Sequence, residues 1–422
     1  MLIHSASQLL TLKGGPQRGH ELGRLEIIPD GAVLIQNEEI AAVGTTEELR
    51  LAYPQEPTLD AGGKVIMPGF VDPHTHAIWA GDRSAEFELR LQGKSYLDIL
   101  AAGGGILSTV RATRTGSLET LLNETRPRLW SMFSYGTTTA EVKTGYGLRT
   151  AAELRMLQAL LTLDKQGPLE IAPTFMGAHA IAPEFRDRPD DYTDLICNTM
   201  LPVLKDWWPH QAPYKEMPFV DVFCETGAFS LEQSRRILSG AKELGFPLKI
   251  HADEFDNLGG ARLAAELGAA SADHLVKTSP EDILALAHSD TVAISLPCTP
   301  FGLAEPHYTP ARAFLEADGL LAIATDLNPG TAWCESMQFA IALACRYLRL
   351  TPAQAIVAAT INAAAGIARA DRIGSIEVGK QADLLILSAS DSRHLGYRFG
   401  INLVQKVIKK GHLYPVQSAY PG

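Results

Sequence analysis

Residues 67–76 read MPGFVDPHTH, an apolar run that ends in an aspartate, a proline and two histidines separated by one threonine. In extended backbone the side chains of residues i and i+2 point to the same side, so His74 and His76 can bind one metal ion together. An isolated HxH pair is a weak signal, because it often arises by chance. Its meaning therefore depends on the residues that follow the other apolar runs of the chain.

Seven further apolar runs follow the first, and segments with helical periodicity separate several of them. This alternation is typical of βα units on a parallel sheet. Eight is the strand number of a closed barrel, so the sequence predicts an α/β fold with a TIM-like (β/α)8 barrel. The eight runs are 65–72, 137–143, 171–178, 219–225, 247–253, 270–275, 291–297 and 320–326.

Polar or titratable residues stand at or just past the end of seven of these eight runs. In β/α barrels the catalytic groups lie at the carboxyl ends of the strands, where the βα loops converge. Seven coincidences are hard to assign to chance, so the pattern predicts one site at that end of the barrel. The residues are His74, His76, Glu141, Lys143, His179, Glu225, His251, Glu254, His274 and Asp326.

The two ends of the chain have a different pattern, made of short strand-like segments joined by turns. Residues 31–35 and 40–44 flank a polar stretch and form a plausible hairpin, while 383–387 and 404–408 are strand-like near the other end. The ends are therefore predicted to pair into one small β-sandwich domain. Its boundaries are 1–65 together with 373–422, and the barrel occupies 66–372.

Composition excludes several classes of function. The chain has 422 residues and a formal net charge of -11, without a long lysine or arginine run, which argues against nucleic-acid or anionic-membrane partners. Its five cysteines are widely spaced and include no CxxC pair, so a reducing cytoplasm fits better than a disulfide framework. The start of the sequence has no signal-peptide pattern, and no run of about 18 apolar residues could cross a bilayer. A cytoplasmic protein is expected.

A metal site is predicted from four strand ends. His251 ends the fifth run and Asp326 ends the eighth, so they add a third nitrogen and a carboxylate to the HxH pair. Three histidines and one aspartate form a site for one divalent metal with an open position for water. Such an ion lowers the pKa of bound water and polarises a carbonyl oxygen, which suits hydrolysis at an sp² carbon.

The general base stays open at this point, because Asp326, Glu254 and His274 are all candidates to take the proton of the water. The fourth run ends in Glu225 rather than in a lysine, which favours a single metal over a pair bridged by a carbamylated lysine. Lys143, at the end of the second run, is the one lysine that stands against this interpretation.

These motifs resemble the amidohydrolase superfamily, through residues 67–76, the later His251, His274 and Asp326, and the segment GKQADL at 379–384. The chain is most similar to the branch that opens the ring of 4-imidazolone-5-propanoate to N-formimidoyl-L-glutamate in histidine degradation. The segments that carry this closer likeness are LQGKSY at 91–96, GGGI at 103–106, TAEVKTGYG at 139–147, FMGAHA at 175–180, KIHADE at 249–254 and ATDLNPG at 324–330.

The resemblance implies zinc or iron, one ion per subunit, held by His74, His76, His251 and Asp326. It also implies a small-molecule substrate and a homodimer. Arg83 offers a planar guanidinium suited to the propionate carboxylate, and the loop after the eighth run offers an amide, a backbone N–H and a hydroxyl. The residues that would surround the substrate are Arg83, Tyr146, His179, Glu254, Asn328, Gly330 and Thr331.

Two segments depart from the family pattern, Cys298 after the seventh run and AWC at 332–334 after the eighth. They put the loop shape and substrate tolerance in question more than the reaction. Cys298 as a nucleophile is disfavoured, because no separate base is dedicated to it. Two other functions compete: a deaminase of cytosine or guanine type, and a catalytically silent barrel that binds a metal or a metabolite.

Overall fold

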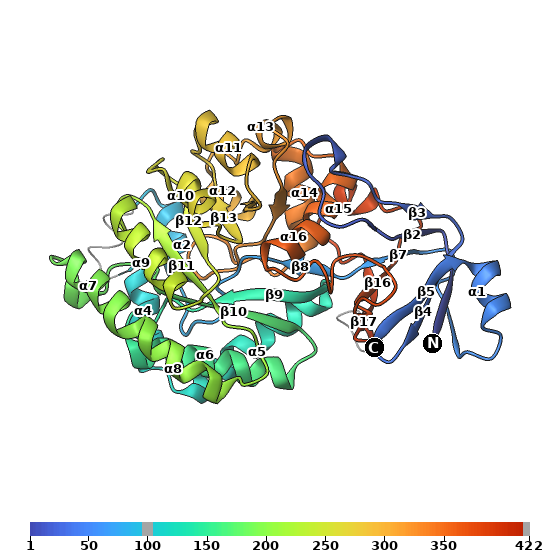
Figure 1. Ribbon diagram of the computed structural model, residues 1–422, viewed down its shortest axis with the longest axis horizontal. Helices are drawn as coiled ribbons and strands as arrows, with labels where there is room; N and C mark the ends of the chain where they lie inside the picture. Colours follow the sequence, from blue (N-terminus) through green and yellow to red (C-terminus); the bar gives the residue numbers. More distant parts are fainter. Residues whose placement is uncertain (95–103, 417–422) are drawn as a thin grey trace.

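The computed structural model describes residues 1–94 and 104–416. Figure 1 shows an elongated molecule, with a barrel at one side and the strands from the two chain ends at the other. Ser95, Tyr96 and Gly103 of the family motifs lie outside the described residues, as do residues 417–422 of the predicted small domain.

Eight parallel strands form the barrel and pair in chain order, which confirms the predicted architecture. The barrel closes where its first and last strands meet: the backbone N–H of His76 donates to the Leu327 carbonyl over 2.8 Å, and that of Asp326 to the His74 carbonyl over 3.1 Å. Each predicted run overlaps one strand of the barrel. The strands are β8 (Phe70–Asp72), β9 (Thr137–Lys143), β10 (Glu170–Ala178), β11 (Phe219–Cys224), β12 (Lys249–Ala252), β13 (Ser271–His274), β14 (Val292–Ser295) and β15 (Leu321–Ile323).

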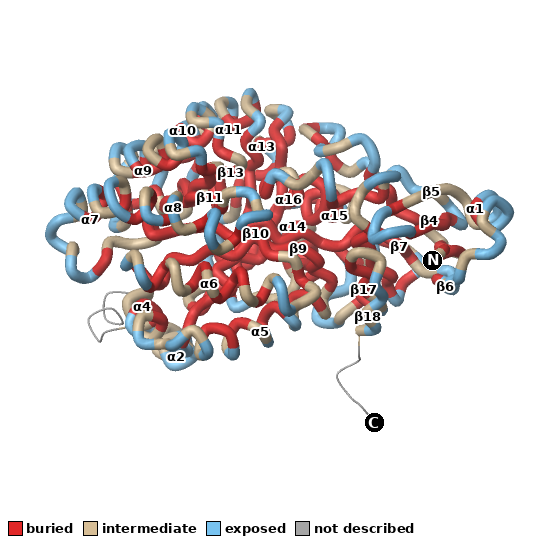
Figure 2. Tube along the Cα trace, turned by 60° about the horizontal axis from the view of Figure 1, so that its bottom comes forward, coloured by how far each residue is buried: buried red, intermediate tan, exposed pale blue. Residues whose placement is uncertain are grey.

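Helices surround the barrel, and Figure 2 shows buried residues at the centre and exposed ones along the outer turns. Local signals fix several helix starts; α9, for example, begins with a capping box in which Ser230 and Gln233 satisfy each other's backbone N–H. The helices around the barrel are α2 (Ser84–Leu91), α4 (Ile106–Thr115), α5 (Leu118–Ser134), α6 (Thr150–Gln166), η2 (Pro183–Phe185), α7 (Pro189–Leu195), η3 (Ile196–Met200), α8 (Leu201–Gln211), α9 (Leu231–Glu243), α10 (Gly260–Leu267), α11 (Pro280–Ala287), α12 (Cys298–Leu303), α13 (Ala311–Glu316), α14 (Met337–Tyr347), α15 (Pro352–Ala358) and α16 (Ile361–Gly366).

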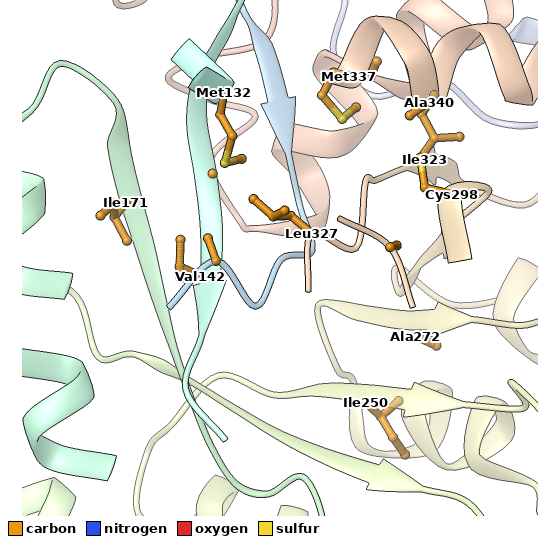
Figure 3. Close-up of a cluster of buried hydrophobic side chains, with 14 of the residues drawn as sticks. Met132, Val142, Ile171, Ile250, Ala272, Cys298, Ile323, Leu327, Met337 and Ala340 are labelled. Carbon is orange, nitrogen blue, oxygen red and sulfur yellow. The ribbon is translucent and has the colours of Figure 1, made fainter. Parts of the chain in front are cut away.

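The barrel strands are buried on both faces, so alternate side chains enter two different cores. Ile250 of β12 belongs to the large apolar cluster between strands and helices, which also contains Val142 of β9 and Met132 of α5 (Figure 3). Its neighbours Lys249 and His251 share the opposite face and point into the barrel. The interior face of the barrel therefore carries the polar chemistry.

The chain ends form two sheets that pack on each other, as the predicted β-sandwich requires. Buried Ile3, Val33, Ile66 and Leu384 form one cluster between the sheets. One sheet contains β5 (Glu39–Thr45), β4 (Gly31–Gln36), β1 (Leu2–Ala6) and β6 (Thr58–Asp60), and the other β18 (His412–Pro415), β17 (Val404–Lys409), β16 (Leu384–Leu387), β7 (Val65–Pro68), β2 (Gln8–Leu10) and β3 (Ile27–Ile28). Short helices α1 (Thr46–Ala52), η1 (Gly19–Glu21) and α17 (His394–Tyr397) complete the segments at the ends.

The first apolar run differs from its prediction as a single barrel strand, because it is divided at Gly69. Residues 65–68 form β7, which pairs with β16 of the other chain end, and only β8 joins the barrel. A Cβ at Gly69 would lie 2.3 Å from the Thr138 hydroxyl, so a glycine is needed where the chain passes from one sheet to the other. Residues 66–68, which the predicted boundary gave to the barrel, thus pair with the chain ends.

Among the described residues, no helix combines the length and apolar character that crossing a bilayer requires.

Candidate metal centre and active site

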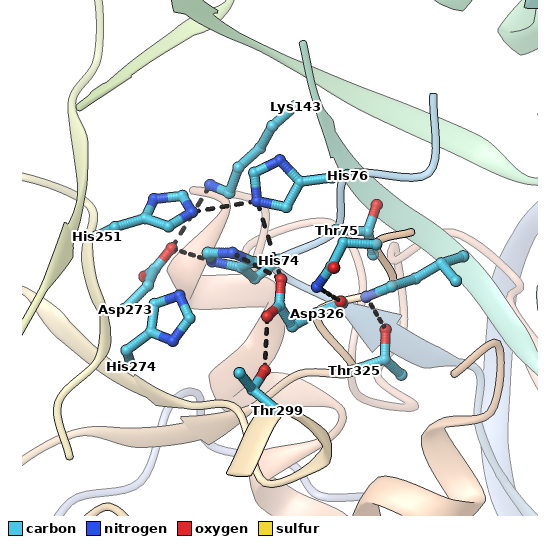
Figure 4. Close-up of polar contacts among 12 residues, drawn as sticks. His74, Thr75, His76, Lys143, His251, Asp273, His274, Thr299, Thr325 and Asp326 are labelled. Atoms are coloured by element: carbon cyan, nitrogen blue, oxygen red, sulfur yellow. Dashed lines mark hydrogen bonds and ion pairs between the residues drawn. The ribbon is translucent and has the colours of Figure 1, made fainter. Parts of the chain in front are cut away.

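Five side chains from four separate parts of the barrel meet at the carboxyl ends of the strands (Figure 4). His74 and His76 follow β8, His251 lies in β12, His274 ends β13, and Asp326 follows β15. All five are buried. The Nε2 atoms of His76 and His251 are 3.1 Å apart, and Asp326 Oδ1 lies 3.5 Å from His74 Nε2 and 3.8 Å from His76 Nε2.

These donor atoms fit a divalent metal ion. His74 Nε2 is buried without a hydrogen-bond partner, although it faces a carboxylate and three other imidazoles. His74, His76 and Asp326 offer ligand atoms within 4.8 Å of one another. An orphaned buried nitrogen is costly unless something binds it, and imidazole nitrogen with carboxylate oxygen is a typical donor set for zinc and similar ions.

Neutral imidazoles are required, because a protonated ring cannot bind a metal. Burial lowers the pKa of His74 and His76 well below the ordinary value, and the neighbouring positive charge of Lys143 lowers both further. Burial likewise lowers the pKa of His274. These rings are therefore neutral at physiological pH and present lone pairs.

Two carboxylates that the sequence analysis missed orient the ligand histidines. Asp273 Oδ2 lies 2.6 Å from His74 Nδ1, and Asp221 Oδ1 lies 3.1 Å from His251 Nδ1. The Nδ1–H of each ring thus donates to a carboxylate, which leaves the Nε2 lone pair for the metal. The signal was present in the sequence: each aspartate interrupts an apolar run, Asp221 in FVDVFC and Asp273 in SADH.

His274 and Glu254, two of the candidate bases, are neighbours beside the metal ligands. Their Nδ1 and Oε2 atoms are 3.6 Å apart. Burial, together with the charges of Asp326 and Glu225, raises the pKa of Glu254 well above its ordinary value. The backbone at His274 and Asp326 has φ of +80° and +54°, a left-handed conformation that non-glycine residues adopt at a cost and that aims both side chains at the site.

Tyr146 and His179 form one wall beside the ligands. The His179 ring stacks on His76 with centroids 4.6 Å apart and lies 5.2 Å from the Tyr146 ring. Burial lowers the pKa of His179 to about 3, and its Nδ1 lies 3.1 Å from the Gly145 carbonyl, which leaves Nε2 as an acceptor. A Cβ at Gly145 would lie 2.8 Å from that ring, and its φ of +111° also favours glycine.

A further residue that sequence reasoning missed, Glu153, holds the loop that carries Tyr146. Its fully buried carboxylate accepts from the backbone N–H groups of Gly145, Gly147 and Leu148 over 2.9, 2.7 and 2.7 Å. Glu153 lies in the first turn of α6, where an acidic residue is common for helix-dipole reasons, so the sequence alone offered no distinguishing signal.

Arg83 and the loop after β15 meet on the other side of the site. A Cβ at Gly330 would lie 2.5 Å from Arg83 Nη1, so the guanidinium lies directly against that loop. Arg90, which was not predicted, donates to the Gly330 carbonyl over 2.9 Å. Two arginines are thus close to the predicted position of the substrate carboxylate, where Glu86 also contacts Arg83 at 2.9 Å.

Asn328 is brought to the site, but its polar atoms are used within its own loop. The side-chain oxygen accepts from the backbone N–H groups of Gly330 and Thr331, both over 2.8 Å, and the amide nitrogen donates to the Asp326 carbonyl over 2.7 Å. These bonds shape the loop and fix the backbone at Asp326, while the role of Asn328 in binding the substrate stays a prediction.

The two segments that depart from the family pattern pack beside the site without adding a nucleophile. A hydrogen bond with Cys334, and burial, raise the pKa of Cys298 well above the ordinary thiol value, so it is not a thiolate. Trp333 stacks edge-on against Trp79 with ring centroids 4.9 Å apart. The guanidinium of Arg128 lies over the Trp79 ring, with its Cζ atom 3.4 Å from the ring centroid.

Comparisons with known proteins identify the family of this chain. A model described as the amidohydrolase family matches residues 225–414, and one described as an imidazolonepropionase-like composite domain of bacteria matches residues 31–55. An imidazolonepropionase from Herpetosiphon aurantiacus is 54% identical over 98% of this chain and 96% of its own length. The chain belongs to the imidazolonepropionase family. A second imidazolonepropionase, from Chloroflexus aggregans, is 49% identical over 98% of each chain.

Solved structures outside the imidazolonepropionase family share the fold. A triazine hydrolase variant has a TM-score of 0.74 at 17% identity, covering 98% of this chain and 94% of its own. The guanine deaminase of E. coli has a TM-score of 0.71 at 17% identity and 98% coverage of both chains, and a zinc-bound adenosine deaminase from Xanthomonas campestris has 0.69 at 20%, over 98% and 92%. These identities are low, so the likeness concerns the fold alone.

Proposed function

We propose that this protein is a metal-dependent hydrolase that opens the ring of 4-imidazolone-5-propanoate to N-formimidoyl-L-glutamate, the step of histidine degradation that its relatives' name describes. The observation that carries the proposal is the buried cluster of three imidazoles and one carboxylate at the mouth of the barrel, with Arg83 against the loop that follows Asp326. Membership of the imidazolonepropionase family supports the choice of substrate.

His74, His76, His251 and Asp326 would hold one divalent ion, and this donor set suits zinc or iron. When bound, the ion supplies Lewis acidity toward the ring carbonyl and lowers the pKa of a bound water. Thr299 supports the arrangement by donating to Asp326 Oδ2 over 2.5 Å, which leaves Oδ1 directed at the histidines.

His274 is the general base that the geometry favours among the three candidates. Its ring is neutral, and its nitrogen lies within 4.8 Å of ligand nitrogens of His74 and His251. Taking a proton from the attacking water makes it an imidazolium, which then gives that proton to the ring nitrogen as the amide C–N bond breaks. Burial, with the charges of Asp326 and Glu225, raises the pKa of Glu254 and so favours its protonated form, which would donate a hydrogen bond that orients the substrate ring.

The remaining predicted residues would bind and orient the substrate. Arg83 is the partner for the propionate carboxylate, with Arg90 as a second cation beside it. Tyr146 and His179, whose ring planes are inclined at 57°, provide two aromatic contacts for the imidazolone ring, with the phenol and Nε2 available for hydrogen bonds. Gly330 and Thr331 border the carboxylate position, and Asn328 keeps that loop in shape.

The test is direct: purified protein is mixed with freshly prepared imidazolone propionate, and the loss of its ultraviolet absorbance is followed with and without a chelator. We expect decay that needs the metal, with N-formimidoyl-L-glutamate detected by mass spectrometry and no ammonia. Ammonia release from a nucleobase without ring opening would instead support a deaminase, and no turnover at all would support a silent barrel.

The ligand assignment has its own test. His251→Ala should abolish turnover and lower the metal content, and a variant that stays fully active and metal-loaded would contradict the assignment. Metal analysis of the wild-type protein distinguishes zinc from iron. The homodimer and the cytoplasmic location stay predictions, and light scattering in solution tests the first of them.

A further inference from the structure

Behind the metal ligands, the inside of the barrel holds a second cluster of charged side chains, whose lysines have no role in the proposed reaction. It consists of two lysines and three carboxylates, and all five side chains are 0% exposed. Two ammonium groups against three carboxylates leave one negative charge. Burying so many charges is expensive unless each one is paired, so the arrangement requires an explanation. The residues are Lys143, Lys249, Glu141, Asp221 and Asp273.

Lys143 lies at the centre of this cluster. Its Nζ is 2.7 Å from Glu141 Oε1, 2.6 Å from Asp221 Oδ2 and 3.5 Å from Asp273 Oδ2. Lys249 approaches from the other side, with Nζ 3.0 Å from Glu141 Oε2 and 2.6 Å from the Pro73 carbonyl. Burial lowers the pKa of Lys143, but Asp221, Glu141 and Asp273 raise it by more, so the ammonium is kept.

The carboxylates around Lys143 are the same ones that orient the ligand histidines. Asp221 binds Lys143 through Oδ2 and His251 through Oδ1, and Asp273 lies near both Lys143 and His74. The ammonium is therefore one carboxylate away from two proposed metal ligands, on the side opposite the centre.

The surroundings of the ammonium have the composition of a metal site. His74, Glu141 and Asp273 present ligand atoms within 4.8 Å of one another, distinct from the grouping of His74 with His76 and Asp326. The Nδ1–H of His74 already donates to Asp273, so the donors at this position are the carboxylate oxygens, which divalent ions commonly bind. Lys143 contributes a covalently attached cation at this position, one that cannot dissociate.

We propose that Lys143 is a positioning residue that takes the place of a second divalent cation, so that the centre binds a single metal ion. It fixes Asp221 and Asp273 for His251 and His74, and it fills the inner position electrostatically. A carbamate on Lys143, which would bridge two metals, would add a negative charge within hydrogen-bond distance of Glu141 and Asp221. Those contacts are attractive only for an ammonium.

Removing the ammonium should open the inner position. Lys143→Ala leaves Glu141, Asp221 and Asp273 with only Lys249, an uncompensated buried charge that a divalent cation can balance. Lys143→Gln keeps most of the volume and a hydrogen-bond donor but has no charge, and it serves as the second variant in case the first does not fold. Lys409→Met is the matched control, because Lys409 is also buried and paired with Glu170 at 3.2 Å and Asp383 at 2.7 Å, away from the metal ligands.

The measurement is the number of ions per chain, determined by elemental analysis after incubation with zinc sulfate and dialysis. We expect one ion in the wild type and in Lys409→Met, and two in the Lys143 variants. A gain of an ion is informative, because mere damage to the structure would lose metal. Visible spectra of cobalt-substituted protein give a second readout, with added absorption from the new site.

The inference rests on the proposed metal centre. The results distinguish a failure of the proposed centre from a failure of the role given to Lys143. A wild type that binds no metal contradicts the proposed centre itself. A folded Lys143 variant that still binds one ion with unchanged affinity overturns only the role of Lys143. If neither variant folds, titration of the wild type with zinc decides: one tight step supports the proposal, and two tight steps overturn it.

Discussion

Residues that never touch the substrate determine what the metal ligands can do. His74 and His251 were predicted from their strand ends, but a free imidazole can carry its proton on either nitrogen. Asp273 and Asp221 remove that ambiguity, because each accepts the Nδ1–H of one ring at 2.6 and 3.1 Å. The ligand set thus depends on buried aspartates as much as on the histidines.

Asp273→Asn tests this dependence. The amide keeps the shape but loses the charge that holds the His74 tautomer, so we expect metal affinity to fall by about 10- to 100-fold. Competition with a chromogenic chelator measures it. Asp256→Asn, on the nearby loop after β12, is the control and should leave the affinity unchanged. Equal affinity for Asp273→Asn and the wild type would show that Asp273 does not tune the ligand.

Glu153→Gln tests the loop that carries Tyr146. Three backbone N–H groups bind the Glu153 carboxylate, and a glutamine replaces one acceptor oxygen by a donor. An unsatisfied buried group costs about 1–3 kcal/mol, so kcat/KM should fall by roughly tenfold or more while metal content stays constant. Glu119→Gln, in the first turn of α5, controls for helix-dipole effects. An unchanged kcat/KM would argue against Tyr146 as a substrate contact.

At the scale of elements, local sequence patterns predicted the barrel well, because each strand and each strand-end residue is encoded within a few positions. What they could not predict depends on partners distant in the chain. The division at Gly69 follows from the pairing of β7 with β16 and from the close approach of Thr138. The role of Lys249 was not predictable for the same reason, because its carboxylate partner Glu141 comes from another strand. The position of Lys249 inside an apolar run therefore did not indicate a charge cluster.

A different ion-pair cluster joins the barrel to the sheet of the chain ends. Glu170, at the start of β10, contacts Arg369 at 2.9 Å and Lys409 of β17 at 3.2 Å, and it also pairs with Arg372. Burial raises the pKa of Glu170, but Lys409, Arg369 and Arg372 lower it by more, so it lies below the ordinary value of 4.5. The ionised form therefore stabilises the folded state.

Glu170→Gln should lower the free energy of unfolding by about 3 kcal/mol near pH 7, because Arg369 and Lys409 lose their partner. A group with a depressed pKa contributes stability above its unfolded pKa and loses it as pH falls. The difference between wild type and variant should thus shrink below about pH 4.5. Urea unfolding across pH checks this, with the exposed Glu266→Gln as a control expected to change little. A difference independent of pH would contradict the charge argument.

At the scale of the whole molecule, the metal centre joins the first barrel strand to the last. His74 and His76 follow β8, and Asp326 follows β15, so an ion bound by all of them would clamp the seam where the barrel closes. Metal removal should therefore affect global stability as well as activity.

Removal of the metal by a chelator is expected to lower the melting temperature by roughly 5–10 °C, because a ligand at 1,000 times its Kd stabilises by about 4 kcal/mol. Differential scanning calorimetry measures the shift, and elemental analysis verifies the removal. Readdition of zinc should restore the original value. A melting temperature that does not change after verified metal loss would show that the metal does not stabilise the closure of the barrel between β8 and β15.

The pairing of β7 with β16 also sets an order for biosynthesis. β7 leaves the ribosome early, whereas its antiparallel partner β16 is among the last strands to be made. Until then the edge of β7 presents unpaired backbone groups that can pair with another chain. The nascent protein must keep this edge protected for nearly the whole of its translation. A truncated mRNA that lacks the codons for β16 would therefore produce a chain whose β7 edge is unpaired and prone to aggregation.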